Sequence, residues 1–354
     1  MKNYKLLKSL LLILCSVVFI QCTSDPVMGP AGADGTNGAN GIDGVNGADG
    51  ATGTATCVAC HSESHRDPIE SSFLMSGHAN GTASGYTSTK AGCTECHTND
   101  GHLNFLSGQP AVTTSAEGIS CITCHEKHGT FDFENDGNDF ALRNFEPVPM
   151  RLVDYEYEFD YQDADGNSTT SNNCVICHQT RRQPNVDDDD DGQIAISSHY
   201  GPHYGGQSLL LEGILGVEME GSLTYPEVGS AKHRTGASCV SCHMGTENDN
   251  DGQHTMIPTL NACNSCHGDA AASIQETFQA EIHDLMDAIK VLLIKEGSVD
   301  ETGAPIKDVL VDIVVSDATW NYRYIYYDHS YGLHNPDYAR ALLTNTLEKL
   351  QARP

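Results

Sequence analysis

Cysteine and histidine recur in one fixed pattern along this chain of 354 residues. Two cysteines three positions apart are followed at once by a histidine in Cys57-Cys60-His61, Cys93-Cys96-His97, Cys121-Cys124-His125, Cys174-Cys177-His178, Cys239-Cys242-His243 and Cys263-Cys266-His267. Two thiols at this spacing can form thioether bonds to the two vinyl groups of one porphyrin, while the adjacent imidazole ligates the iron. The pattern therefore predicts six covalently bound haems of the c type.

Two other interpretations of the cysteines are structural zinc and disulfide bonds. Cys-x-x-Cys pairs also occur in zinc ribbons, and exported proteins form disulfides. Neither interpretation requires a histidine directly after every second cysteine. Of the 14 cysteines, the two outside the motifs are Cys15 and Cys22, both near the N-terminus. Haem attachment accounts for all the others and is the interpretation we favour.

Composition and charge limit which fold classes and which binding partners are expected for the chain. Apolar residues make up 39% of the chain and aromatic residues 7%, which is sparse for a domain that must bury a conventional core. We therefore expect a mainly α fold with extensive loops and little sheet, a multihaem cytochrome c wrapped around a stacked haem core. The formal charge of -29 makes nucleic acid an unfavourable partner.

The N-terminus predicts export and a membrane anchor. Lys2, Lys5 and Lys8 precede an apolar run that is too short to span a bilayer, so residues 1–21 have the pattern of a signal peptide. The run ends at Cys22, where bacterial lipoprotein signals place the cysteine that is acylated, although Gln21 is larger than the residue usual before it. We expect a lipoprotein of the outer membrane or cell surface. The alternative is a plain secretory signal and a periplasmic protein.

Glycine occupies every third position from Gly29 to Gly53. One interpretation of residues 22–54 is a flexible tether that holds the rest of the chain away from the membrane. The other is a short collagen-like stalk that would form a homotrimer, because only glycine fits the axis of a triple helix. Proline, which favours collagen, is represented in the run by Pro30 alone.

The rest of the chain divides by character into a six-haem domain, 55–268, and a C-terminal helical subdomain, 269–354. A strand pair is expected near 150–161. Apolar residues recur at helical spacing over 274–293 and Gly297 supplies a stop, which predicts a long helix. A second helix is expected over 317–327, and a third begins with Asn335 as its cap and Pro336 at its first position.

Eleven histidines lie outside the motifs and could provide the second axial ligands. A haem with two histidine ligands is saturated and suits electron transfer, whereas an open position permits substrate binding, and the number of histidines does not decide between them. His128 lies three residues after His125 and could reach a neighbouring haem. Between His199 and His203 we favour His203. The remaining candidates are expected on the surface or in helix packing: His65, His102, His283 and His329.

From about residue 56 to the C-terminus the chain resembles the multihaem cytochrome superfamily of pentahaem nitrite reductases, octahaem hydroxylamine and tetrathionate enzymes and tetrahaem electron-transfer cytochromes. The resemblance lies in the first haem motif and in 76–79, 118–120, 232–238, 254–258 and 332–336. It implies that histidines in these segments are distal ligands to haems remote in sequence. The residues it assigns to this role are His78, His233, His254 and His334.

The chain departs from the nitrite reductases it resembles, because they have lysine in place of the histidine of one haem motif. All six motifs here end in histidine. We therefore expect an electron carrier between other redox proteins, with no catalytic residue. The alternative is a multihaem reductase or oxidoreductase of small nitrogen or sulfur compounds with one open haem.

Three acidic loops have the pattern Asp-x-Asp-Gly, in which oxygen ligands at alternate positions precede a turn. The first is Asp163-Asp165-Gly166, and the other two provide the calcium candidates Asp187, Asp189, Asp191, Asp249 and Asp251. The glutamate that closes an EF-hand loop is replaced by Ser198 and Pro258. Bound calcium and solvated acidic loops are both consistent with this pattern.

Overall fold

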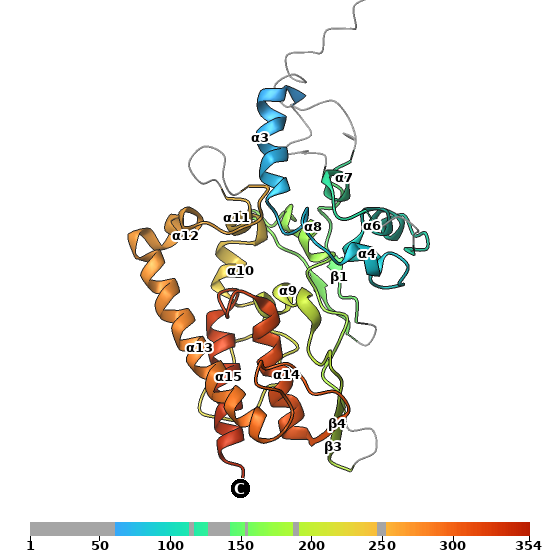
Figure 1. Cartoon of the computed structure of the whole chain (residues 1–354). Coiled ribbons are helices and arrows are strands. Elements are labelled where there is room, and N and C mark those ends of the chain that lie inside the picture. Colours follow the sequence, from blue (N-terminus) through green and yellow to red (C-terminus); the bar gives the residue numbers. More distant parts are fainter. Residues whose placement is uncertain (1–60, 113–116, 127–141, 153–154, 187–190, 246–252) are drawn as a thin grey trace, which may run out of the picture. The chain divides into compact units, whose positions relative to one another are not determined.

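The second to sixth haem motifs lie on or beside short helices joined by loops (Figure 1). The structure is a computed structural model that describes residues 61–112, 117–126, 142–152, 155–186, 191–245 and 253–354. The predicted signal peptide, Cys22 and the Gly-x-y segment lie outside the described residues. In the first part of the described chain the helices are α3 (Glu63–Leu74), α4 (Ser84–Thr87), α5 (Thr94–His97), α6 (Asn99–Leu106), α7 (Cys121–Cys124) and α8 (Ser171–Val175).

The middle of the chain also consists of short helices and turns joined by loops. It contains the 3-10 turn η1 (His203–Gly205), α9 (Gln207–Glu212), α10 (Lys232–Gly236), α11 (Cys239–His243), α12 (Leu260–His267) and the turn η2 (Gly268–Ala270). Two antiparallel strand pairs complete this region: β1 (Val148–Pro149) with β2 (Glu158–Phe159), and β3 (Gln193–Ile196) with β4 (Val309–Asp312). The mainly helical architecture with few strands agrees with the sequence-based expectation.

Serine and threonine caps explain why helices of one or two turns begin where the motifs begin. Ser120 forms a capping box with Thr123 at the start of α7, and Ser238 forms one with Ser241 at the start of α11. Thr259 caps α12 by accepting a hydrogen bond from the amide of Ala262. Such caps satisfy amide groups that a short helix leaves without partners. One helical turn then places both cysteines of a motif on the same face.

The three C-terminal helices confirm the predicted pattern. α13 runs over Ala271–Lys295, and Gly297 beyond it has the left-handed φ of 74° that suits a helix stop. α14 covers Ile313–Asp328, and α15 covers Pro336–Gln351 with Asn335 as its cap. The three helices pack against one another, in orange and red in Figure 1.

The hydrophobic core is more extensive than the composition predicts. Buried side chains of α13, α14 and α15, such as Ile289, Trp320 and Leu342, join one cluster with Phe159 and Leu209 from the haem-motif region. The β3–β4 pair, which the sequence did not predict, also connects these two parts of the chain. The proposed boundary at 268/269 thus separates segments that share a core, and residues 54–354 group as one compact unit.

Asp317 on α14 is half-buried, and burial together with nearby Asp312 raises its pKa to about 6. The folded state therefore binds a proton that the unfolded chain releases, so stability is lost as pH rises from about 4 to about 6. With a discount for solvent screening, Asp317→Asn should raise the free energy of unfolding by about 1–2 kcal/mol near pH 7.5 and little near pH 4. Urea unfolding at both pH values measures this difference. An equal gain at both would contradict the assignment to ionisation.

None of the helices in the described ranges is long and apolar enough to cross a bilayer.

Candidate functional site

Five motif histidines each face a histidine from another part of the chain. The ring centroids are 5.9 Å apart for His178 and His78, 6.1 Å for His97 and His203, 6.3 Å for His125 and His254, 6.2 Å for His267 and His233, and 6.2 Å for His243 and His334. Metal–nitrogen bonds of about 2 Å, with about 1 Å more from each nitrogen to its ring centre, place two axial imidazoles about 6 Å apart. The spacing in each pair therefore fits one iron between the rings.

The pairs bring together five of the six predicted distal histidines with five motif histidines. The sequence did not say which histidine would face which motif, and the structure provides that assignment for the residues it describes. His203, not His199, faces His97; His199 is exposed. The first motif is only partly described: His61 is described, whereas Cys57, Cys60 and the predicted ligand His128 lie outside the described residues.

Hydrogen bonds orient several of these rings through Nδ1. The carbonyl oxygen of Leu333 lies 2.5 Å from Nδ1 of His233, and the carbonyl oxygen of Met256 lies 2.8 Å from Nδ1 of His243. Met256 has a left-handed φ of 57°, a conformation unfavourable for methionine, and its carbonyl contacts the ring from there. Occupying Nδ1 leaves Nε2 as the nitrogen available to a metal, as is typical of metal-binding histidines.

Burial keeps most of the paired imidazoles neutral. It lowers the pKa of His78 to about 4, with a further contribution from His178, and lowers the pKa of His203 to about 4, with contributions from Arg181 and Arg182. Burial is also the main cause of the lowered pKa of four other paired histidines, namely His97, His178, His243 and His254. Only neutral imidazole has a free lone pair for a metal, so these side chains are in the ligating form at neutral pH.

Cysteines of different motifs contact one another. The thiols of Cys96 and Cys177 lie close enough for each to shift the pKa of the other, and so do the thiols of Cys174 and Cys239. The thiol of Cys242 is electrostatically coupled to the thiols of Cys263 and Cys266, and that of Cys124 to Cys174. The ten motif cysteines in the described ranges form no disulfide bonds. The attachment sites of the second, third and fifth motifs thus lie near that of the fourth, and the attachment site of the sixth motif lies near that of the fifth.

The four histidines expected on the surface or in helix packing differ in their surroundings. His102 is buried on α6, with Nδ1 2.8 Å from the carbonyl oxygen of Glu95. His283 on α13 packs against Tyr331 at 4.1 Å between centroids, and His329 stacks on Tyr204. His65 is exposed on α3.

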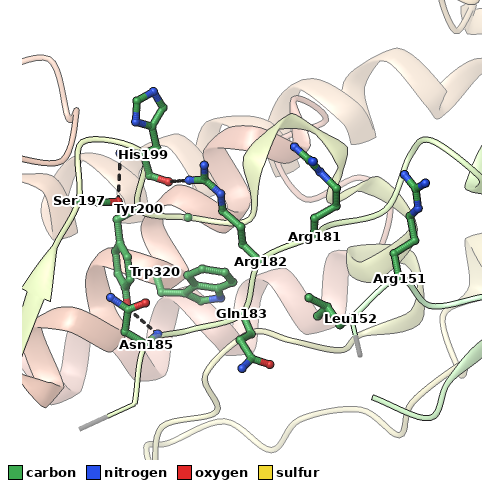
Figure 2. A pocket seen from close by; sticks show the side chains of 11 residues that line it. Arg151, Leu152, Arg181, Arg182, Gln183, Asn185, Ser197, His199, Tyr200 and Trp320 are labelled. Atoms are coloured by element: carbon green, nitrogen blue, oxygen red, sulfur yellow. Dashed lines mark hydrogen bonds between the residues drawn. The ribbon is translucent and has the colours of Figure 1, made fainter. Parts of the chain in front are cut away.

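A cationic cavity that sequence reasoning missed lies close to the His97–His203 pair. It has a volume of about 530 Å³, and Figure 2 shows the side chains of Arg151, Arg181 and Arg182 along it. Arg181 is near enough to both paired histidines to lower the pKa of each, after the larger effect of burial. The available signal in the sequence was the pair of adjacent arginines three and four residues after His178, in a chain with a formal charge of -29.

The arginines of this cavity differ in their partners. Arg151 forms an ion pair of 2.5 Å with Glu95. Arg181 and Arg182 instead donate to the main-chain carbonyls of Gly92 and His199, and neither has a carboxylate within ion-pair distance among the described residues. Guanidinium groups bind carboxylates through paired hydrogen bonds. The cavity therefore suits a carboxylate-bearing ligand.

The acidic loops are described only in part. Asp163 accepts hydrogen bonds from the amides of Asp165 and Asn167, both at 2.9 Å, and Asp191 accepts one from the amide of Gln193 at 2.8 Å. The candidates Asp187, Asp189, Asp249 and Asp251 lie outside the described residues. Within the described ranges, no group of three or more histidine, cysteine, aspartate or glutamate side chains converges on a metal position. Calcium binding stays a prediction.

Comparisons with known proteins give two similar solved structures. The outer cell wall cytochrome OcwA is 20% identical with a TM-score of 0.47, and the match covers 80% of this chain and 50% of that one. The undecahaem cytochrome from the S-layer of Carboxydothermus ferrireducens is 17% identical with a TM-score of 0.45, covering 77% of this chain and 40% of that one. The chain thus spans half or less of the length of these proteins. No protein-family model and no curated protein matches the chain.

Proposed function

We propose that this chain is a hexahaem c-type cytochrome that carries electrons in the cell envelope or at the cell surface. The observation that carries the proposal is the set of five histidine pairs, each with the separation that one iron requires. Each pair includes a motif histidine directly after two cysteines, so thioether attachment and axial ligation fall at the same place. When bound, each haem supplies one-electron Fe(III)/Fe(II) chemistry.

The protein residues hold the cofactors and set the order of the sites. Contacts between Cys96 and Cys177 and between Cys174 and Cys239 support a continuous series of sites through the fourth motif. At the five paired sites the two histidines leave no axial position for a substrate, which favours a carrier over an enzyme. Arg181 and Arg182 are suitably placed to bind haem propionates near the His97–His203 pair.

The number of haems and their coordination can be measured on protein matured in a host that attaches haem c. Intact-mass spectrometry should show six haem additions, and electron paramagnetic resonance of the oxidised protein should show low-spin iron only. Zinc or disulfides in place of haem would give a mass without these additions and end the proposal. A high-spin signal from one haem would instead favour a reductase with an open site.

The proposed location rests on the N-terminal sequence. Acylation of Cys22 would anchor the chain, and residues 22–54 would act as a tether that lets the haem domain reach donor and acceptor proteins. Cys22→Ser should move the protein from the membrane fraction to the soluble fraction. Sedimentation of a chain that lacks 22–54 beside the full chain distinguishes a tether from a trimeric stalk, since only the stalk would change the oligomeric state.

A further inference from the structure

Asp328 at the end of α14 is a buried carboxylate bonded to one of the paired histidines. Its side chain is fully buried, and Oδ1 lies 2.5 Å from Nδ1 of His334, which faces His243. Oδ2 accepts hydrogen bonds from the amide of Ser330, at 3.1 Å, and from its hydroxyl. Both oxygens accept, as an ionised carboxylate does.

This carboxylate distinguishes His334 from the paired histidines whose Nδ1 contacts a neutral group. His233 and His243 have main-chain carbonyls at Nδ1, and His178 has the side-chain oxygen of Gln207 at 3.2 Å. Burial alone would lower the pKa of His334, yet the Asp328 carboxylate raises it, whereas burial lowers the pKa of His178 and His243. The loop that ends α14 therefore gives one ring a charged partner.

We propose that Asp328 is a positioning residue that lowers the midpoint potential of the iron held between His243 and His334. This inference rests on the proposed function, since it requires haem at that pair. A carboxylate at Nδ1 draws the ring proton toward itself and makes Nε2 a stronger donor, which favours the ferric state. Its negative charge acts in the same direction through a low-dielectric interior. Reduction adds one electron to the iron, and the Nδ1 proton stays between His334 and Asp328.

The same loop also orients the neighbouring pair. Leu333, one residue before His334, holds His233 through its carbonyl oxygen, and His233 faces His267. Residues 328–334 thus orient histidines of two sites. The charged carboxylate of Asp328 contacts His334, and the neutral carbonyl group of Leu333 contacts His233. The fifth-motif site should hold an electron less tightly than the sixth-motif site, which favours transfer from the fifth toward the sixth.

Asp328→Asn tests the charge, because asparagine keeps an oxygen acceptor for His334 and loses the negative charge. In a spectroelectrochemical titration of the six-haem protein, one haem equivalent should become about tenfold easier to reduce, a rise of about 59 mV. The highest g value of one low-spin signal should increase, since the ligand field of that imidazole weakens. The signals of the other haems should stay in place.

Ser330→Ala is the matched control, because it removes a hydroxyl contact to the carboxylate and keeps the charge at His334. Ser330→Ala should not raise the midpoint potential of any haem. Asp328→Glu, which keeps the negative charge, should give a midpoint potential near that of the native protein. Unchanged midpoints in an Asp328→Asn protein with six haems, or an equal rise in both variants, would overturn the inference. Absence of haem at the fifth motif in the native protein would instead overturn the proposed function, and mass spectrometry of the peptide that contains Cys239 and Cys242 identifies that case.

Discussion

Replacing both Cys174 and Cys177 with alanine should have the largest effect on this molecule. The two thiols belong to the fourth motif, and they contact Cys239 and Cys96 of the fifth and second motifs. Loss of the haem between them would leave a cavity in the interior, with a cost of at least the ~3–5 kcal/mol of a large aromatic truncation. It would also interrupt the series of sites. Intact mass should show five haem additions, and stopped-flow reduction should become markedly slower and biphasic.

The sixth motif provides the control. Cys263→Ala with Cys266→Ala also removes one haem, but Cys266 is exposed and, among the motifs whose cysteines are described, the sixth neighbours only the fifth. We expect five haem additions again, with rapid reduction of the remaining haems in a single phase. If the two double variants behave alike in reduction kinetics, the fourth motif is not central to the conduit, and the order inferred from cysteine contacts is wrong.

The features that could be predicted from the sequence, such as helix ends and haem-attachment motifs, depend mostly on residues close together in the chain. α15 begins at Pro336 behind the Asn335 cap, and α13 ends before Gly297, because caps and stops act within one turn of the chain. The cysteine motifs are equally local, since thioether attachment and the adjacent ligand need only five consecutive residues. His254 was assigned by the resemblance and His203 was a preference over His199; the structure places their rings opposite His125 and His97, and their role as iron ligands stays a prediction.

Pairing between remote segments could not be predicted in the same way. β3 and β4 form short strands more than one hundred residues apart, and nothing in either strand identifies its partner. The same holds for Asp328, whose role depends on a loop that turns back so that His334 reaches it. Composition also underestimated the side-chain core, because an average over the chain hides the concentration of buried residues such as Trp320 in the C-terminal part.

Arg234 on α10 should contribute more to stability than any exposed ion pair of the described chain. It lies one residue after His233, and its Nε is 2.7 Å from the carboxylate of Glu212, whose side chain has 0% exposure. Tyr157 donates to the same carboxylate at 2.8 Å. Burial would lower the pKa of Arg234, but Glu212 raises it, so the guanidinium stays charged beside the buried carboxylate.

Arg234→Met should lower the free energy of unfolding by about 3–5 kcal/mol at neutral pH, because it leaves a buried carboxylate without its cation. Loosening of α10 should also weaken ligation by His233, which the low-spin signal of one haem would report. Guanidinium unfolding of the haem-loaded variant beside the native protein at neutral pH measures the stability change.

A matched control and a double variant separate the charge from the packing. Arg340→Met breaks the Arg340–Glu281 pair, whose side chains are 36% and 42% exposed, and should cost less than about 1 kcal/mol. Adding Glu212→Leu to Arg234→Met removes the stranded carboxylate and should recover most of the loss. If the double variant is as unstable as Arg234→Met alone, the cost arises from lost packing of the arginine stem. The unpaired carboxylate of Glu212 would then not be the cause of the stability lost in Arg234→Met.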